Sequence, residues 1–429
     1  MIRGKRRRGE RPGHNATTAH FQALYPFLAE GGLGAPGVYI GRDACGGAWV
    51  FDPWRAYEAG ILPGPNMLVV GQLSRGKSAF LKTYIARQAI FGRQAWVLDP
   101  KGEFAPLADF LGGTTIALVP GGEVRLNPIS PRMGREGQLS LLRSVAAAAL
   151  RRELTPEEDA GLRVALRVVS AAEPREPTLP EVVAALLHPS AEMTAEVVMD
   201  AGDFAASTRQ VALALQRLCE GDLRGMFDGP TSKGLDLDAS FVALDLSAMQ
   251  DSSALGILMT CAAAWLQGVV LERKRAAESK EGDPPKVILA VDEAWRISAD
   301  LGVAEWLQRS FKLSRAHGVQ NIIALHRLSD LGAAGAAGSR EARIAEGLIA
   351  DADTKVILAQ PPDQIEGLRS LLGLSATEAE LVPTLRRGEA LWQVGRRSFL
   401  VQHRLSSIEQ AIVDTDARMV RHREAAGAA

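Results

Sequence analysis

The chain has 429 residues, 47% of them hydrophobic and 23% charged, and its 49 lysines and arginines nearly balance 50 aspartates and glutamates. This composition is typical of a globular protein, and it excludes a basic field over the whole molecule of the kind that attracts nucleic acid. Three cysteines without a Cys-x-x-Cys motif indicate neither a disulfide framework nor a zinc site, and they fit a reducing cytosol. The length predicts one large α/β body with a smaller part inserted or appended.

The first 65 residues are predicted to form two parts. Residues 1–20 carry a basic stretch from Arg3 to Arg8 and are predicted to be a disordered arm, either solvated or in contact with phosphates or anionic lipid. No apolar segment follows the basic stretch, so a secretory signal peptide is not expected. Residues 21–65 are predicted as a strand-rich lead-in, with strand-like pieces at 37–40 and 48–51.

A core of alternating strands and helices is predicted over residues 66–132 and 227–405. Its short apolar runs lack polar alternation, which is typical of a mostly parallel sheet covered by helices on both faces. The fold class predicted is therefore α/β, a RecA-like P-loop NTPase with a mostly parallel central sheet. The predicted strands are 67–70, 95–98, 115–119, 241–246, 287–291, 322–325 and 356–358, followed by a hairpin of 389–393 and 398–403.

An all-helical insertion is predicted for residues 133–226, where helical periodicity occurs at 139–150, 157–170, 179–187 and 208–218. Residues 406–429 are predicted to be a helical or disordered tail. The apolar run 254–271 is almost long enough to cross a membrane, but it is rich in alanine and contains Thr260, Gln267 and Gly268. We therefore expect a buried core helix there.

A complete phosphate-loop motif, G-x-x-x-x-G-K-S, lies between the strand at 67–70 and a helix at 79–88. In this motif the glycines let backbone N–H groups converge on phosphates, and the N-terminus of the helix adds partial positive charge. Lys77 is expected to contact the β- and γ-phosphates of ATP, and the Ser78 hydroxyl to bind Mg²⁺. The predicted nucleotide-binding residues here are Gly71, Gln72, Leu73, Ser74, Arg75, Gly76, Lys77, Ser78 and Ala79.

Two carboxylates follow the apolar strand at 287–291, in the form of a Walker B segment. Asp292 is expected to hold Mg²⁺ and Glu293 to polarise the attacking water. A strand that ends in Asp-Glu also occurs as the N-cap of a helix, and it is the phosphate loop at Gly71 that favours the catalytic interpretation.

Polar residues at two further strand ends are expected at the same edge of the sheet, because the carboxyl ends of parallel strands meet there. Asp99 and Glu103 follow the second core strand and are predicted to contact the nucleotide, and His326 follows the strand after Walker B as a predicted catalytic residue. The alternatives are a simple Asp-Pro turn at Asp99 and an interior histidine at 326.

Two arginine sites are candidates for reaching the γ-phosphate of a neighbouring subunit, where negative charge grows in the transition state. Arg315 lies before the strand at 322–325, and Arg387 follows Arg386 just before the final hairpin. The alternative for each is a solvated surface arginine.

These motifs together resemble the conjugal-transfer or type IV secretion ATPases of the TraC type, within the HerA–FtsK superfamily of motors. The resemblance covers about residues 37–405 and rests on several segments at once. They are Gly71 to Ser78, Asp99-Pro-Lys-Gly-Glu103, Arg125-Leu-Asn127-Pro128, Val291-Asp-Glu-Ala-Trp295, the stretch 315–325 and Arg387-Gly-Glu-Ala-Leu391.

The resemblance implies a homo-oligomer, a hexameric ring with ATP and Mg²⁺ between subunits and with Arg315 or Arg387 acting in trans. It also implies conjugation or secretion channel proteins as partners, and a cytoplasmic location, peripheral at the inner face of the cell membrane through those partners. Two features depart from the family. About sixty residues precede the phosphate loop where the family has a large N-terminal domain, and Leu325-His326-Arg327 stands where the family has Thr-Gln.

Three functions follow as hypotheses. The first is an ATP-hydrolysing motor of a conjugation or type IV secretion-like machine. The second is a DNA translocase of the HerA–FtsK kind, in which the ring pumps duplex DNA and the basic arm captures phosphates. The third is a nucleotide-binding scaffold that does not hydrolyse ATP, suggested by His326 and the missing N-terminal domain, although Lys77 and Glu293 favour an active site.

Overall fold

The computed structural model describes residues 32–131, 134–150, 152–171, 176–221, 223–236, 239–249, 252, 255–278, 286–294, 301–328 and 340–413. The predicted basic arm at 1–20, the first part of the lead-in and Trp295 of the Walker B segment lie outside these residues. So does the tail beyond residue 413.

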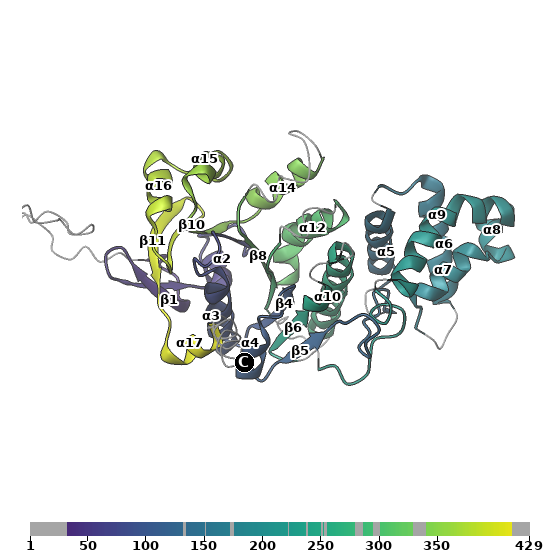
Figure 1. Ribbon diagram of the computed structural model, residues 1–429, viewed down its shortest axis with the longest axis horizontal. Helices are drawn as coiled ribbons and strands as arrows, with labels where there is room; N and C mark the ends of the chain where they lie inside the picture. Colours follow the sequence, from purple (N-terminus) through teal and green to yellow (C-terminus); the bar gives the residue numbers. More distant parts are fainter. Residues whose placement is uncertain are drawn as a thin grey trace, which may run out of the picture.

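One sheet of 11 strands forms the centre of the molecule, in the order β2-β1-β11-β10-β9-β3-β8-β7-β4-β6-β5 (Figure 1). The strands from β9 to β5 in this order are parallel, as the apolar runs predicted. These parallel strands are β3 (Met67–Val70), β4 (Gln94–Asp99), β5 (Thr114–Ala117), β6 (Phe241–Asp245), β7 (Val287–Val291), β8 (Val319–Leu325) and β9 (Thr354–Leu358).

Four antiparallel strands extend the sheet beyond β9. The predicted hairpin is confirmed as β10 (Glu389–Val394) and β11 (Arg397–His403), with Val394 opposite Arg397. β1 (Val38–Asp43) pairs with β11, and β2 (Ala48–Phe51) pairs with β1. The strand-like pieces of the predicted lead-in are therefore an edge of the same sheet.

Helices cover both faces of the sheet because successive side chains of its strands point to opposite sides. Met67 and Val69 of β3 belong to a buried cluster with Leu81 of α3 (Lys77–Ile90). Leu68 and Val70 belong to a second cluster with residues of α10 (Leu255–Glu278) and α12 (Leu301–His317). Both faces of β3 are therefore buried, which explains its uninterrupted apolar sequence.

The apolar run predicted as a core helix is α10, and its side chains Leu258, Ala262 and Leu266 are buried in the second cluster. Within the described part of the chain, no helix has the length and apolar character needed to span a membrane.

Strand β8 begins three residues before its predicted start. The prediction missed the first half of the strand because polar residues occupy it. Gln320 accepts a hydrogen bond at Oε1 from the hydroxyl of Tyr84, and Asn321 donates one from Nδ2 to Oδ1 of Asn66. These partners satisfy Oε1 of Gln320 and Nδ2 of Asn321, whose side chains are both buried in the strand. The apolar pattern alone does not reveal such partners.

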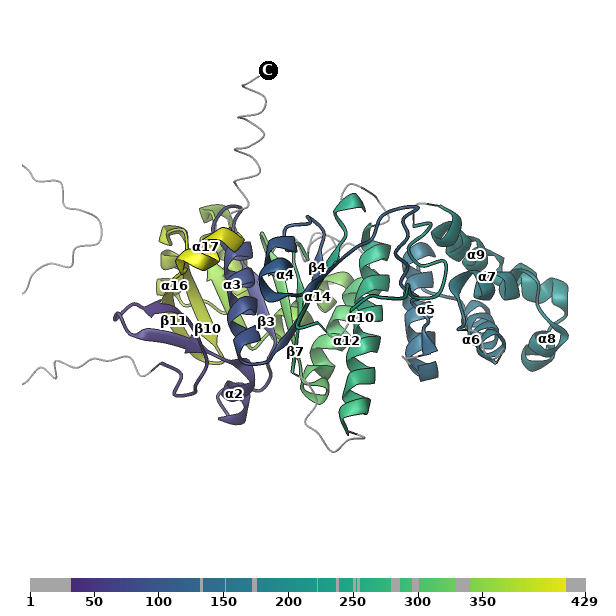
Figure 2. The ribbon, with the colours of Figure 1, turned by 90° about the horizontal axis from the view of Figure 1, so that it is seen from below.

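Helices fill the chain between β5 and β6, apart from loops. The predicted periodic segments correspond to four of them, and α8, which begins after the N-cap Ser190, was not predicted because it has only seven residues. In both views α6 to α9 lie at one end of the molecule, beyond α5 (Figures 1 and 2), and α5 packs against α10 and α12. The helices among the described residues of this segment are α5 (Gly134–Leu150), α6 (Pro156–Ser170), α7 (Leu179–Leu187), α8 (Ala191–Val197) and α9 (Ala201–Glu220).

The other helices in the described parts of the chain are short connections around the sheet. They are α2 (Pro53–Glu58), α4 (Ala105–Leu111), α14 (Arg340–Ala350), α15 (Ile365–Leu372), α16 (Ala376–Leu381) and α17 (Ser407–Val413), with 3₁₀ turns at Ser247–Met249, Pro362–Gln364 and Val382–Thr384.

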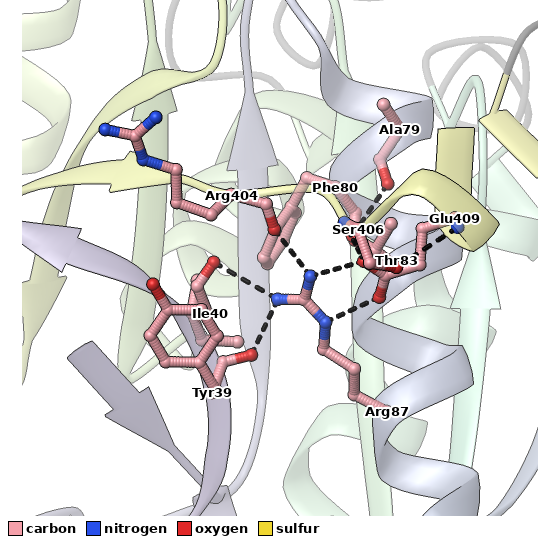
Figure 3. A network of polar contacts seen from close by, with 9 residues as sticks. All are labelled: Tyr39, Ile40, Ala79, Phe80, Thr83, Arg87, Arg404, Ser406 and Glu409. Atoms are coloured by element: carbon pink, nitrogen blue, oxygen red, sulfur yellow. Dashed lines mark hydrogen bonds and ion pairs between the residues drawn. The ribbon is translucent and has the colours of Figure 1, made fainter. Parts of the chain in front are cut away.

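Helix α17 is joined to α3 by the side chain of Arg87 (Figure 3). The Arg87 guanidinium donates to both carboxylate oxygens of Glu409, each at 2.7 Å, and to the carbonyl oxygens of Tyr39, Ile40 and Arg404. One side chain on the helix that follows the phosphate loop therefore holds β1, the end of β11 and α17 in place.

Candidate functional site

Four neighbouring parallel strands, β3, β8, β7 and β4, end at the same edge of the sheet. The phosphate loop follows β3, His326 follows β8, Asp292 and Glu293 follow β7, and the Asp99 loop follows β4. The sequence prediction placed these residues at one edge, and the strand order makes their strands adjacent.

The phosphate loop is held to the sheet by its own backbone. The N–H of Gly71 donates to the carbonyl oxygen of Leu325, and the N–H of Gln72 to that of Ala359. A Cβ atom at position 71 would lie 2.8 Å from Cβ of Leu358, so only glycine fits there. Gly76 has a φ of 105°, which a side chain would disfavour. The loop ends at α3, whose first N–H groups form a site suited to an anion.

Lys77 is buried and already has partners in this structure. Its Nζ donates to the carbonyl oxygen of Gly71 at 2.7 Å and lies 2.7 Å from Nδ1 of His326. An ammonium group can only donate, so Nδ1 of His326 accepts and the neutral ring carries its proton on Nε2. Nε2 lies 2.8 Å from Oε2 of Glu293 and donates to it. His326 therefore links Lys77 to Glu293.

Asp292 and Glu293 are both buried, with exposed fractions of 2% and 3%. Glu293 has a φ of 53°, uncommon for a residue with a side chain, and its N–H donates to Oδ1 of Asp292. Burial, together with the charge of Glu293, raises the pKa of Asp292 to about 6, although Lys77 and Lys101 act to lower it. The carboxylate of Asp292 thus lies where a cation would stabilise it.

Asp99 organises its own loop. Its Oδ1 accepts from the N–H of Lys101 at 3.2 Å and its Oδ2 from the N–H of Phe104 at 2.8 Å, and burial raises its pKa. Glu103 lies half-buried in the same loop. The contacts of Asp99 fit the turn alternative, and direct contact of Asp99 or Glu103 with nucleotide stays a prediction.

Two residues of this edge were not predicted as site residues. Lys101 donates from Nζ to Oε1 of Glu293 at 2.6 Å, so the carboxylate is held by Lys101 on one oxygen and His326 on the other. Gln360, buried after β9, donates from Nε2 to the carbonyl oxygen of His326 at 2.9 Å. The polar segment after β4 was a signal for Lys101, whereas Gln360 requires knowledge of the strand order.

The two candidate arginines lie at opposite edges of the sheet. Arg387 is in a turn in which the N–H of Glu389 donates to the carbonyl oxygen of Arg386, and Gly388 of this turn donates to the carbonyl oxygen of Arg75. Arg387 thus lies next to the phosphate loop of its own chain. Arg315 is in the last turn of α12, before β8 begins, at the edge far from that loop.

The residues present fit Mg²⁺. Ser78, the second residue of α3, offers a hydroxyl and Asp292 a carboxylate, and Mg²⁺ prefers few protein oxygens combined with phosphate and water oxygens. A divalent cation beside Asp292 would also compensate the burial that raises the pKa of this carboxyl.

Comparison with known proteins found no matching family profile and no matching curated protein. Solved structures do match. VirB4 of Thermoanaerobacter pseudethanolicus is similar with a TM-score of 0.68 and 22% identity, over 87% of this chain and 98% of that chain. The plasmid coupling protein TrwB, in complex with the non-hydrolysable ATP analogue ADPNP, gives a TM-score of 0.58 and 17% identity, over 87% of this chain and 90% of that chain.

The chain has the fold of VirB4 and TrwB. The predicted α/β class with a mostly parallel sheet is confirmed, and so, at the level of the fold, is the predicted resemblance to proteins of bacterial conjugation. TrwB has also been solved in complex with ADP and Mg²⁺, with a TM-score of 0.55 and 16% identity over 80% of this chain and 86% of that chain.

Proposed function

We propose that this chain binds Mg·ATP and hydrolyses it as a motor of a conjugation or type IV secretion-like machine. The observation that carries the proposal is the chain of contacts from Lys77 through His326 to Glu293, directly beside a complete phosphate loop. It joins the residue expected to contact the phosphates to the residue expected to activate water. Nucleotide complexes of TrwB, which has the same fold, support the proposal.

The residues divide the work in the following way. The loop from Gly71 to Ser78 binds the phosphates through its N–H groups. The ammonium group of Lys77 leaves its hydrogen-bond partners Gly71 and His326 and binds the β- and γ-phosphate oxygens instead. Glu293 accepts a proton from the water that attacks the γ-phosphorus. Ser78 and Asp292 would hold Mg²⁺, which would supply positive charge beside the phosphate oxygens.

His326 takes the place where the resembling family has an amide side chain. When Lys77 turns to the phosphates, Nδ1 of His326 loses its donor while Nε2 keeps Glu293. Nδ1 can then accept a hydrogen bond from a water molecule on the phosphate side, while the attacking water is left to Glu293. A histidine at this position is therefore compatible with turnover.

The motor is proposed to work as a hexameric ring with ATP between subunits, attached to channel proteins at the inner face of the cell membrane. Arg315 is exposed and lies far from the phosphate loop of its own chain, as an arginine that acts in trans must. An arginine in that position can stabilise transition-state charge only at a neighbour's site.

A DNA translocase is the second candidate, and the observation that favours it is the similarity to TrwB, a plasmid coupling protein. In that case the ring would move DNA, and binding of DNA to the ring would be salt-dependent. The cargo distinguishes the two candidates, whereas the nucleotide chemistry is shared.

Steady-state ATPase activity of the purified chain, with and without single- and double-stranded DNA, tests the proposal. We expect turnover that requires Mg²⁺. Lys77→Ala should abolish nucleotide binding and turnover, while Glu293→Gln should keep ATP binding and lower turnover by a factor of about 10² or more.

The outcomes separate the candidates. Strong stimulation by DNA supports the translocase, and turnover indifferent to DNA supports a protein-secretion or assembly motor. Turnover no higher than that of Lys77→Ala supports the third hypothesis, a nucleotide-binding scaffold that does not hydrolyse ATP. Normal hydrolysis by Glu293→Gln contradicts the role assigned to Glu293.

A further inference from the structure

The ion pair between Lys101 and Glu293 has no part in the chemistry described above. Nζ of Lys101 lies 2.6 Å from Oε1 of Glu293, and the two side chains are 30% and 3% exposed. Lys101 thus reaches a buried carboxylate from the surface. The pair is short and largely shielded from water, so it is stronger than an ordinary surface salt bridge.

The loop that carries Lys101 is held in a defined conformation. Asp99 accepts hydrogen bonds from two N–H groups of this loop, one of them that of Lys101 itself. Gly102 has a φ of 68°, and a Cβ atom at this position would lie 3.0 Å from Oγ of Ser247. The backbone from which Lys101 reaches Glu293 is therefore fixed by the fold.

Strand order shows on which side of Glu293 the lysine lies. The order is β3, β8, β7, β4, so the phosphate loop and His326 are on one side of Glu293 and Lys101 is on the other. His326 connects Glu293 to the phosphate side. Lys101 holds the same carboxylate from the side away from the phosphates.

We propose that Lys101 is a positioning residue that restrains the general base Glu293, and that turnover requires this ion pair to loosen. The inference rests on the proposed ATPase function. Any movement of Glu293 toward the γ-phosphate must separate the pair, so the ion pair holds the carboxylate in the position seen in this structure. The exposed part of Lys101 makes the restraint accessible to an anionic group of a partner.

Kinetics of Lys101→Met, which removes the charge and keeps most of the aliphatic chain, provide the first test. We expect kcat for basal ATP hydrolysis to rise by about threefold or more while KM for ATP changes little, because Lys101 does not contact the phosphates. Lys101→Arg, which retains a cation, should lie much closer to the unmodified chain than Lys101→Met does.

Lys286→Met is the matched control. Nζ of Lys286 pairs with Oε1 of Glu58 at 3.0 Å, and its side chain is 31% exposed, but it precedes β7 at the opposite edge of the sheet. Its kcat should equal that of the unmodified chain. A fall in kcat, a rise in KM or no change in Lys101→Met overturns the restraint.

A second measurement does not depend on turnover. Thermal unfolding midpoints are compared for the nucleotide-free chain, Lys101→Met, Glu293→Gln and the double variant. If Lys101 acts through Glu293, the shift caused by Lys101→Met is clearly smaller in the Glu293→Gln background. Equal shifts in both backgrounds overturn the inference.

The two proposals can fail separately. No turnover in any variant, Lys101→Met included, overturns the ATPase function and the restraint together. Turnover in the unmodified chain that Lys101→Met does not increase overturns the restraint alone. Turnover that is seen only after Lys101→Met supports the restraint in its strongest form.

Discussion

Buried charges in the nucleotide site satisfy one another. A continuous series of contacts runs from Lys77 through His326 and Glu293 to Lys101. The two lysines are cationic, Glu293 is anionic and the imidazole is neutral. Asp292 lies beside this series and carries a pKa raised to about 6 by burial. Burial of this carboxylate lowers stability, which is common at functional sites and fits the proposed binding of a metal ion.

Asp292→Asn is predicted to stabilise the chain in EDTA, in a pH-dependent way. A carboxyl whose pKa is higher in the folded chain than its ordinary 3.8 favours folding when protonated, so its destabilising effect is absent below pH 3.8 and complete above about 6. Replacement by the uncharged amide should raise the free energy of unfolding at pH 8 by up to about 3 kcal/mol, and by about half of that at pH 5.

Urea denaturation at the two pH values measures this difference. Asp353, whose pKa is also raised to about 6, is present in both chains and cancels in the comparison. An equal gain at pH 8 and pH 5 would show that packing, and not charge, was changed. The same variant should lose Mg²⁺-dependent turnover.

At the residue scale, the sequence predicted the groups that local patterns define. The phosphate loop and the Asp292–Glu293 pair each follow a strand and have fixed spacing, so their position at the sheet edge could be derived. The partners of these groups could not. Lys101 meets Glu293 and Gln360 meets His326 only because distant segments become neighbouring strands.

Helix α3 begins at Lys77 and so carries the end of the phosphate loop. Arg87 on this helix forms hydrogen bonds with Glu409 and with three carbonyl oxygens. Arg87→Met should lower the free energy of unfolding by about 2–4 kcal/mol, because it removes the cationic partner of the Glu409 carboxylate and the guanidinium hydrogen bonds to three carbonyl oxygens. The two side chains of the pair are only 14% and 10% exposed.

Arg55→Met is the control for this prediction. Arg55 pairs with Glu58 at 2.8 Å, but the side chains are 55% and 46% exposed, so its loss should change the free energy of unfolding by less than about 1 kcal/mol. Equilibrium urea unfolding, followed by circular dichroism, compares the two variants. Similar losses for both would mean that α17 contributes little to the stability of α3.

Element boundaries show the same division between local and distant causes. Apolar runs predicted every parallel strand, and the strand at 287–291 was predicted to the residue. The first half of β8 was missed because Gln320 and Asn321 are polar, and their burial depends on Tyr84 and Asn66. The union of β1 with β11 could not be predicted either, since nothing near residue 40 indicates a partner near residue 400.

The arrangement of the whole molecule leads to a prediction about Arg315 and Arg387. In a ring, Lys77→Ala subunits retain both arginines but have no working phosphate loop of their own. Mixed with Arg315→Ala subunits, they should restore part of the lost ATPase activity, because Arg315 lies far from its own loop and would act on a neighbour.

Mixing Lys77→Ala with Arg387→Ala should restore none, since Arg387 lies beside the loop of its own chain. Light scattering in the presence of ADP measures the size of the assembly in the same samples. Recovery with Arg387→Ala, or its absence with Arg315→Ala, would contradict these assignments.

The strand order also has a kinetic consequence. Met67 in β3 pairs with Ile322 and Thr354, and Gly41 in β1 pairs with His403, so the contacts around the phosphate loop join segments far apart in the chain. Contacts between residues that are far apart in the sequence make folding slow. During translation β3 and the phosphate loop are synthesised early, but most of the chain must follow before β8 and β9, the neighbours of β3, have been synthesised. Until then the apolar side chains of β3 are exposed, and we expect the nascent chain to need chaperones.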